Sequence, residues 1–117
     1  MVKFTWAPGA VANDKAYQTC PVAGTIVRIR IYASASCSAV VDIYKDTWAN
    51  YPPQGGSPSD SIVNGGTKPT LSSSDHSEDT TLTSYTTSVS AGDVFVGNLD
   101  TAPGGVIQLN VEVWIQE

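Results

Sequence analysis

The stretch from position 107 to position 116 constrains the fold most, because apolar and polar side chains alternate along it without a break. Its odd positions carry only aliphatic residues: Ile107, Leu109, Val111, Val113 and Ile115. Successive side chains of a β-strand point to opposite faces of a sheet, so this period of two predicts a strand that buries one face. Half-buried strands are typical of antiparallel sheets, and the pattern therefore indicates an all-β fold.

Two earlier segments alternate in the same way and lie close together in the sequence. They are residues 25–32, where the apolar face begins at Val27, and residues 39–45. The short polar run Ser-Ala-Ser at positions 34–36 separates them, which is typical of a turn. We therefore expect these two strands to form a hairpin.

The rest of the chain gives weaker signals. Shorter strands are expected at residues 82–87 and 94–99. Proline and glycine recur between positions 47 and 77, which predicts a long irregular loop with room for a short strand near 61–63. Residues 72–90 are rich in Ser and Thr, and we interpret them as a hydroxyl-rich strand with its turns.

These segments predict one all-β domain of about six to eight strands, an antiparallel β-sandwich of jelly-roll-like form. A jelly roll accommodates the long irregular connection better than an immunoglobulin fold does. The sandwich is expected at residues 23–117. Residues 1–22, which contain Phe4 and Trp6, are expected to form either an N-terminal arm or the first strand.

Composition excludes several classes of partner. The chain has 117 residues, enough for one domain, and a net charge of −5 from 6 basic and 11 acidic residues. Phosphate binding needs clustered Lys and Arg, so nucleic acid and anionic membrane surfaces are not expected partners. No apolar run is long enough to span a bilayer. The N-terminal residues lack the apolar stretch of a signal peptide, so we expect synthesis in a cytoplasm.

Metal and cofactor chemistry has little basis in the sequence. Cys20 and Cys37 are too far apart for a CxxC motif, and His76 is the one histidine. A zinc site within one chain is therefore not expected, nor is a cofactor. We interpret both cysteines as small buried residues, and a disulfide between them remains possible on sequence grounds.

Acidic residues do not assemble into a recognisable catalytic pattern. Asp42, Asp46 and Asp60 have no spacing that would bring two carboxyl groups face to face, as glycoside hydrolysis requires. The acidic run at positions 75–79 lacks the pattern of a calcium loop, and we expect a solvated turn or a cap on the following strand. The chain is therefore not expected to be an enzyme.

Aromatic residues are the strongest candidates for binding a partner: Phe4, Trp6, Trp48, Tyr51 and Trp114. Aromatic side chains dominate protein interfaces and also stack on sugar rings. The alternative interpretation is packing within the chain. Phe4 and Trp6 would then belong to an ordinary first strand. Trp48 and Tyr51, which precede Pro52-Pro53, would cover the end of the sandwich. The last tryptophan lies on the polar side of its strand, where we expect a second layer or a neighbouring subunit to cover it.

Several segments, in order, resemble a known domain. The run 40–53 reads Val-Val-Asp-Ile-Tyr-Lys-Asp-Thr-Trp-Ala-Asn-Tyr-Pro-Pro. It is followed by Asp-Ser-Ile at 60–62, Thr-Lys-Pro-Thr-Leu-Ser at 67–72, Asp-Thr-Thr-Leu-Thr at 79–83 and Ser-Ala-Gly-Asp-Val at 90–94. This order resembles a β-sandwich domain that recurs in virion proteins of tailed bacteriophages, of tail-fibre, tail-associated and capsid-decoration type. The resemblance implies a jelly-roll-like sandwich, a homotrimer and a place on the virion.

Two functions follow as expectations. The first is a non-enzymatic capsid decoration protein, of cement or head-fibre type, that binds the major capsid protein or other virion proteins and stabilises the assembled lattice. The alternative is a tail-fibre tip or tail adaptor that attaches to host glycan through Trp48 and Tyr51. A small glycan hydrolase is a third class, and no catalytic constellation supports it.

Overall fold

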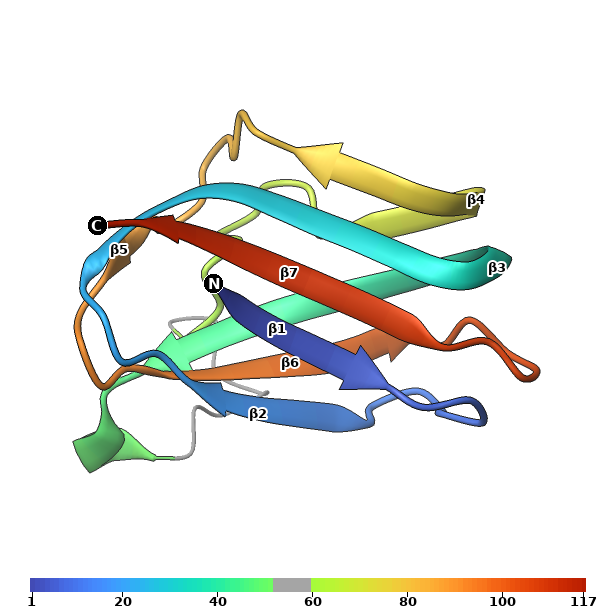
Figure 1. Ribbon diagram of the computed structural model, residues 1–117, viewed down its shortest axis with the longest axis horizontal. Helices are drawn as coiled ribbons and strands as arrows, with labels where there is room; N and C mark the ends of the chain where they lie inside the picture. Colours follow the sequence, from blue (N-terminus) through green and yellow to red (C-terminus); the bar gives the residue numbers. More distant parts are fainter. Residues whose placement is uncertain (52–59) are drawn as a thin grey trace.

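The computed structural model describes residues 1–51 and 60–117, which form seven β-strands and one short 3-10 helix (Figure 1). The strands are β1 (Val2–Trp6), β2 (Lys15–Thr19), β3 (Gly24–Asp46), β4 (Thr70–Asp79), β5 (Ser88–Val89), β6 (Val94–Thr101) and β7 (Leu109–Gln116), and the helix is η1 (Trp48–Asn50). Every strand pair is antiparallel. None of the described residues belongs to a helix long and apolar enough to cross a membrane.

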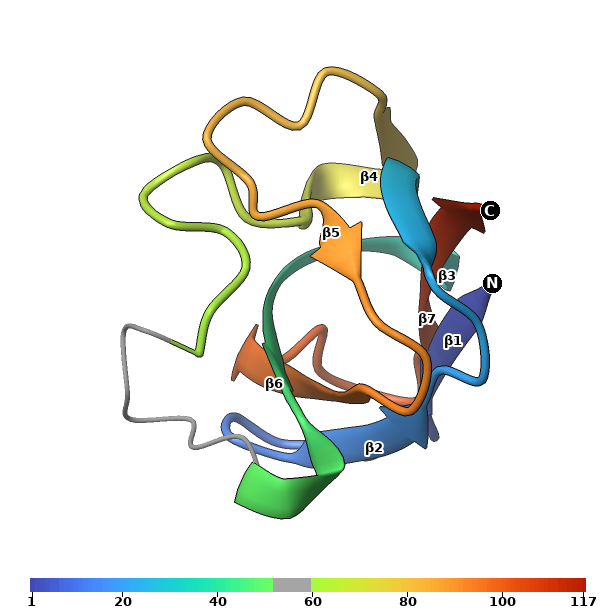
Figure 2. The ribbon, with the colours of Figure 1, turned by 90° about the vertical axis from the view of Figure 1, so that its left-hand side faces the viewer.

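β3 and β4 are bent strands, and the two halves of each belong to different layers of the sandwich. The first layer has the order β1, β7, first half of β3, second half of β4, and the second layer has the order β2, β6, second half of β3, first half of β4. Figure 2 looks along the strands and shows these layers around a common interior. This strand order is that of a jelly roll, so the predicted all-β, jelly-roll-like antiparallel sandwich is confirmed.

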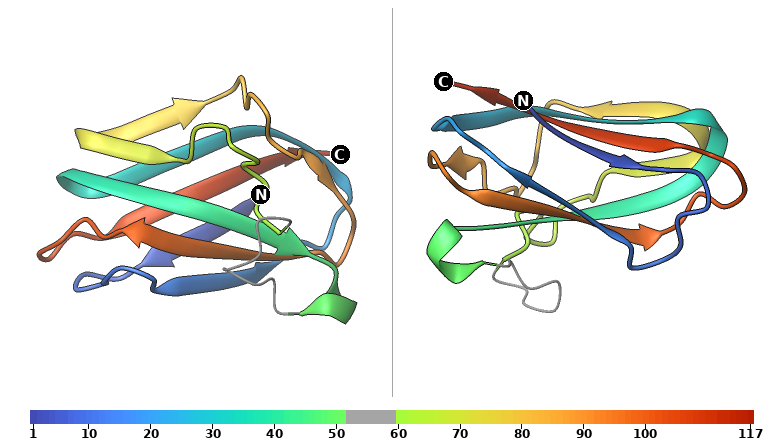
Figure 3. Two further views of the ribbon diagram at one scale, coloured as in Figure 1. Left: turned by 180° about the vertical axis from the view of Figure 1, so that it is seen from behind. Right: turned by 60° about the horizontal axis from the view of Figure 1, so that its bottom comes forward.

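The expected hairpin within residues 25–45 is wrong, because this segment is one continuous strand, β3. Its first half pairs with β7 from Thr25 to Ala33, and its second half pairs with β6 from Val40 to Asp46. The exposed Ser-Ala-Ser run at 34–36 lies where the strand crosses between layers, as both views of Figure 3 show. Small side chains allow a strand to bend at such a corner without leaving the sheet.

The expected apolar face of the first half of β3 is shifted at its start. Val27 is 40% exposed, whereas Ile26 is buried. The register against β7 shifts between Ile26 and Arg28, which is a β-bulge. The extra residue of the bulge exchanges the inward-facing and outward-facing positions that precede it. The alternation predicted from Val27 therefore fails at Val27 itself.

The Ser- and Thr-rich region also differs from its prediction. Residues 82–87 are not a strand: Leu82 and Ser84 have φ values of 52° and 68°, which belong to turns. The strand of this region is β4, which overlaps the start of the expected hydroxyl-rich stretch 72–90 but precedes the expected strand at 82–87, and it pairs along β3. Near 61–63 the structure has only an isolated bridge between Ser61 and Tyr44. Only Leu71 is buried in β4, so hydrophobic periodicity could not reveal this strand.

The strands predicted at 94–99 and 107–116 are confirmed as β6 and β7, the latter beginning at Leu109. The side chains of Leu109, Val111 and Val113 are fully buried in the core between the layers. The alternation of β7 thus identifies its inner face correctly.

The N-terminal segment forms the first strand of the sandwich, and not a separate arm. β1 pairs with β7 along its whole length, from Val2 opposite Val113 to Trp6 opposite Leu109. Phe4 is 0% exposed and Trp6 is 4% exposed, so both rings lie in the core. Of the two alternatives that the sequence left open, the structure shows the first strand, and neither ring is exposed as a surface anchor in this fold.

Candidate interaction surfaces

The outer face of the first layer carries ordered cross-strand rows of polar and aromatic side chains. Strand register places Lys3, Glu112, Arg30 and Glu78 side by side across β1, β7, β3 and β4. The charges in this row alternate, which favours pairing between neighbours. We call this surface the arginine–tryptophan face and define it by Lys3, Arg28, Arg30, Tyr32, Glu112 and Trp114.

Trp114 lies opposite Arg28 on this face, in contact with two guanidinium groups. The Arg28 and Arg30 guanidinium carbons lie 5.7 Å and 5.3 Å from the centroid of the Trp114 ring. These distances are those of cation–π contacts. The tryptophan was correctly expected on the polar side of its strand, and two side chains of its own sheet, not a second layer, partly cover it.

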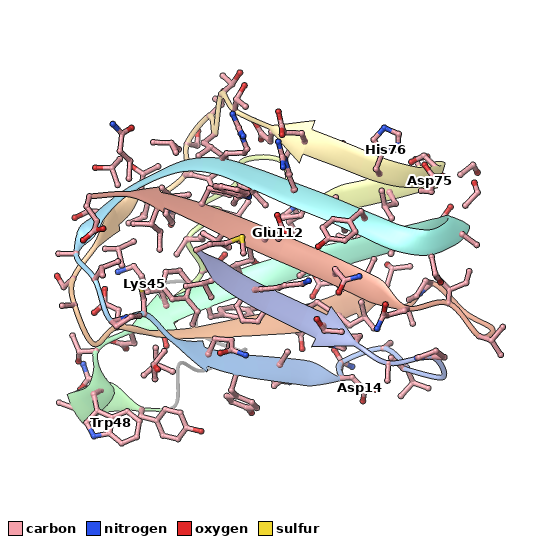
Figure 4. All side chains as sticks on the ribbon, viewed as in Figure 1. Asp14, Lys45, Trp48, Asp75, His76 and Glu112 are labelled. Atoms are coloured by element: carbon pink, nitrogen blue, oxygen red, sulfur yellow. The ribbon has the colours of Figure 1, made fainter. Side chains whose placement is uncertain are left out.

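The Glu112 carboxylate holds both aromatic side chains of the face, Tyr32 and Trp114. Glu112 accepts a hydrogen bond of 2.6 Å from the Tyr32 hydroxyl on one oxygen and one of 3.1 Å from Trp114 Nε1 on the other. Figure 4 labels Glu112 on β7, in the middle of this layer. The Lys3 ammonium lies 5.8 Å from the centroid of the Tyr32 ring. Side chains from three strands are therefore fixed relative to one another.

An ion pair lies at the β4 side of the face. Arg30 Nε is 2.5 Å from Glu78 Oε2, and Arg28 Nε is 3.5 Å from the same oxygen. The hydrogen bond from Arg30 is the main cause that lowers the pKa of the Glu78 carboxyl, and the same bond raises the pKa of Arg30. Both groups are well exposed, so this pair orders the surface more than it stabilises the fold.

The outer face of the second layer carries a hollow with aromatic walls. The hollow has a volume of about 350 Å³ and is lined by Tyr17, Gln18, Thr19, Trp48, Tyr51 and Val94. We call it the aromatic hollow. Trp48 is 66% exposed, Tyr51 48% and Tyr17 47%. Figure 4 shows Trp48 beyond the end of β3, well separated from Glu112.

The three aromatic rings of the hollow form a continuous strip. The Trp48 and Tyr51 ring centroids are 5.3 Å apart with the planes tilted by 33°, and those of Tyr51 and Tyr17 are 6.3 Å apart with a tilt of 52°. These separations are those of favourable aromatic pairs. The strip joins β2 to the turn that follows β3.

Local hydrogen bonds explain why the chain turns here. Asp46 Oδ1 accepts hydrogen bonds from the Thr47 backbone N–H at 2.7 Å and from Asn50 Nδ2 at 3.3 Å. The Tyr51 N–H then donates to the Trp48 carbonyl at 3.2 Å. These bonds close η1 and bring both aromatic side chains back toward β2. Asp46 therefore has a structural role, as an aspartate at the start of a turn commonly does.

The sequence singled out Trp48 and Tyr51 and missed Tyr17. Tyr17 lies in β2, a five-residue strand with little apolar alternation, so only its aromatic character could have drawn attention to it. Pro52-Pro53, which were grouped with this pair, lie outside the described residues.

The carboxylate at position 42 is also held in a structural arrangement. Asp42 is 5% exposed, and its Oδ1 accepts hydrogen bonds of 2.8 Å from both the Ser61 hydroxyl and the Ile43 N–H. Lys68 Nζ lies 3.5 Å from Asp42 Oδ2. Burial, with the adjacent Asp42 carboxylate, raises the pKa of Tyr44 to about 12. A buried carboxylate with these partners is satisfied.

The acidic run at 75–79 lies in the second half of β4, so the expectation of a turn there is wrong. Asp75 Oδ1 is 2.7 Å from Nδ1 of the exposed His76. Asp79 ends the strand and accepts hydrogen bonds from the Thr81 and Leu82 N–H groups, both at 2.9 Å. Across residues 1–51 and 60–117, no group of three or more His, Cys, Asp or Glu side chains could hold a metal ion.

Both cysteines are buried and free. Cys20 Sγ donates to the Val22 carbonyl at 3.3 Å. Burial raises the pKa of the Cys37 thiol. The interpretation of the two residues as small buried side chains is therefore confirmed, and the structure has no disulfide between them.

No family model and no curated protein matches this chain. The resemblance to phage virion domains therefore stays a prediction.

Proposed function

We propose that this chain is a non-enzymatic structural protein of a tailed-phage particle, a capsid decoration subunit that binds the assembled lattice through the arginine–tryptophan face. The observation that carries the proposal is the composition of that face. Trp, Tyr and Arg are the residue types that dominate the energetics of protein interfaces, and here they adjoin one another on one sheet surface.

The order of this face supports its use in binding. Trp114 and Tyr32 are both held by the Glu112 carboxylate, so they need little further ordering when a partner arrives. Binding by prearranged side chains loses less conformational entropy. A sheet also presents the contact residues on a rigid element and not on a mobile loop.

The charges of the arginine–tryptophan face favour a partner whose surface is acidic or of mixed charge. Three of the six basic residues of the chain, Lys3, Arg28 and Arg30, lie on this face, although the net charge of the chain is −5. Complementary charges on a lattice would orient the subunit and exclude wrong partners.

The fold and the sequence resemblance agree with this proposal without carrying it. Jelly rolls are common in viral capsid and lectin domains, yet one fold serves many functions. The stabilising effect would be mass action: a subunit that binds only the assembled lattice shifts the equilibrium toward assembly. The major capsid protein is the proposed partner.

The test is to add the purified chain to virions that lack it and to measure binding by co-sedimentation and image averaging. We expect saturable binding at equivalent lattice positions. The double change Arg28→Ala and Trp114→Ala should reduce binding at least tenfold. The change Val106→Ala, at a residue 86% exposed, provides a surface control. Density confined to the tail would refute the capsid role, and absence of particle binding would refute the virion role.

The resemblance also implies a homotrimer, which we include in the proposal. Sedimentation equilibrium of the purified chain measures this directly. A monomer at all accessible concentrations, both free and on the particle, would contradict it.

A further inference from the structure

We propose that the aromatic hollow binds a neutral carbohydrate, with one sugar ring stacked on the strip formed by Trp48 and Tyr51. This site lies on the outer face of the second layer, opposite the arginine–tryptophan face. The inference is independent of the proposed function, because it applies wherever the chain is located.

The aromatic rings of the hollow are exposed. Trp48, Tyr51 and Tyr17 are each about half exposed or more, whereas Phe4 and Trp6 are buried in the core. Large apolar side chains grouped on a surface mark a binding site more often than single ones do. The exposed strip is therefore suited to a ligand that covers ring faces.

The lining of the hollow combines aromatic rings with neutral polar groups. Besides the rings and Val94, the described lining contains the Gln18 amide and the Thr19 hydroxyl, and none of these described side chains is charged. A sugar ring has an apolar C–H face that packs on an aromatic ring, and its hydroxyl groups require donors and acceptors at the edge. The amide and hydroxyl of β2 can supply both.

The uncharged lining distinguishes between the classes of ligand that pack on aromatic rings. A quaternary ammonium ion would also pack on aromatic rings, but such sites gain from a nearby carboxylate, which this lining lacks. An anionic sugar would meet a chain of net charge −5 without a basic group in the hollow. A neutral carbohydrate is the class that fits both observations.

The size and rigidity of the hollow also suit a sugar ring. Small-molecule sites usually have volumes of about 300–1,000 Å³, and the hollow lies at the lower end of this range. One or two sugar rings fit that volume. β2 pairs with β6 from Lys15 to Thr19, so one wall is part of the sheet. η1, closed by the Asp46 hydrogen bonds, holds the other wall.

The test measures binding of neutral sugars to the purified full chain. The probes are glucose, galactose, mannose and N-acetylglucosamine, together with short neutral oligomers of each. Tryptophan fluorescence provides the readout, because Trp48 is the most exposed of the three tryptophans, and saturation-transfer NMR on the sugar C–H protons is the second measurement. We expect weak, saturable binding with a blue shift of the emission.

Variants locate the site. Trp48→Ala and Tyr51→Ala should each weaken sugar binding about tenfold or more, and Gln18→Ala should weaken it several-fold. Val106→Ala is the control that should leave affinity unchanged. Each variant is first checked for a native thermal transition, and Trp48→Phe keeps a ring for stacking, so partial retention of binding is expected there.

Three results would overturn the proposal. One is absence of binding to every neutral sugar by both methods. Another is binding that Trp48→Ala and Tyr51→Ala leave intact, which would place the sugar elsewhere. The third is binding of tetramethylammonium in place of every sugar, which would assign the hollow to a cation.

Discussion

The packing of β1 against the second layer can be tested at Gly97, where one added methyl group should destabilise the fold. A Cβ built on Gly97 would lie 2.8 Å from Trp6 Cη2 and 3.1 Å from Phe4 Cγ. Carbon atoms at such distances overlap. The Trp6 ring cannot retreat freely, because its Nε1 donates a 3.2 Å hydrogen bond to the Asp14 carbonyl and its side chain is almost fully buried.

The size of the effect follows from two opposing contributions. Overpacking a close-packed core costs about 1–3 kcal/mol. Replacing Gly by Ala within a strand returns about 0.5–1 kcal/mol. The middle of these two ranges gives an expected fall of about 1 kcal/mol in the free energy of unfolding of Gly97→Ala. For a domain of this length that corresponds to a fall in Tm of roughly 4–8 °C.

The assay is urea denaturation and thermal melting of four proteins: the parent, Gly97→Ala, Trp6→Phe and the double variant. Phenylalanine lacks the atom nearest to the added methyl group, so the double variant should be more stable than the sum of the single effects predicts. A coupling energy of about 0.5–2 kcal/mol is typical of residues in contact. Gly92→Ala is the control, because a Cβ there meets no atom within 4 Å and its cost would come from the φ of 90° alone.

The outcome that refutes the reasoning is a Gly97→Ala protein as stable as the parent, with no coupling to Trp6→Phe. That result would mean that the two N-terminal aromatic rings do not pack on β6. The segment would then be a detachable arm after all, and the two rings would again be available to a partner.

Three further predictions concern ionisable and thiol groups. Arg30→Gln should raise the pKa of Glu78 toward its usual range, because the principal hydrogen bond to that carboxylate is lost; an unchanged carboxyl titration by NMR would contradict the pair. Tyr44 should ionise near pH 12 in an absorbance titration. Its pKa is higher in the folded than in the unfolded chain, so the stability of the fold should be intact below about pH 10. The free energy of unfolding should then fall by up to roughly 2–3 kcal/mol as the pH rises to 12. A free energy of unfolding that rises across this range would contradict the prediction. Cys20 and Cys37 should react with a thiol reagent only after unfolding, and rapid reaction of either in the native chain would show that it is not buried.

Sequence patterns revealed the strands that bury one regular apolar face, and β7 is the clearest example. They failed for β4, since a strand at the edge of both layers with a single buried residue has no apolar period to detect. They also failed at the join within β3, because a bent strand and a hairpin share the same sequence of two alternating runs around small polar residues. Only the pairing of each half with a different strand distinguishes the two.

The candidate site residues were predicted unevenly for a similar reason. Aromatic character identifies a residue that packs against something, but it does not tell whether that is the core or a surface. Strand register decides the matter: Phe4 lies opposite Val111 on the inner face of the sheet, and Trp114 lies beside Arg28 on the outer face. Tyr17 was missed because its partner ring, Tyr51, is distant in the sequence and lies just after η1.

The two surfaces lie on opposite faces of the sandwich, and this arrangement has a consequence for how they would act together. A subunit seated on a lattice through the arginine–tryptophan face would hold the outer face of the second layer away from the lattice. The aromatic hollow would then remain accessible. Repetition of a weak site over many lattice positions raises overall avidity through effective concentration, even where a single site binds sugar weakly. The two inferences are thus compatible, although each can fail without the other. A chain that binds the particle but no sugar would retain only the lattice role, and one that binds sugar but no particle would be an independent binding module.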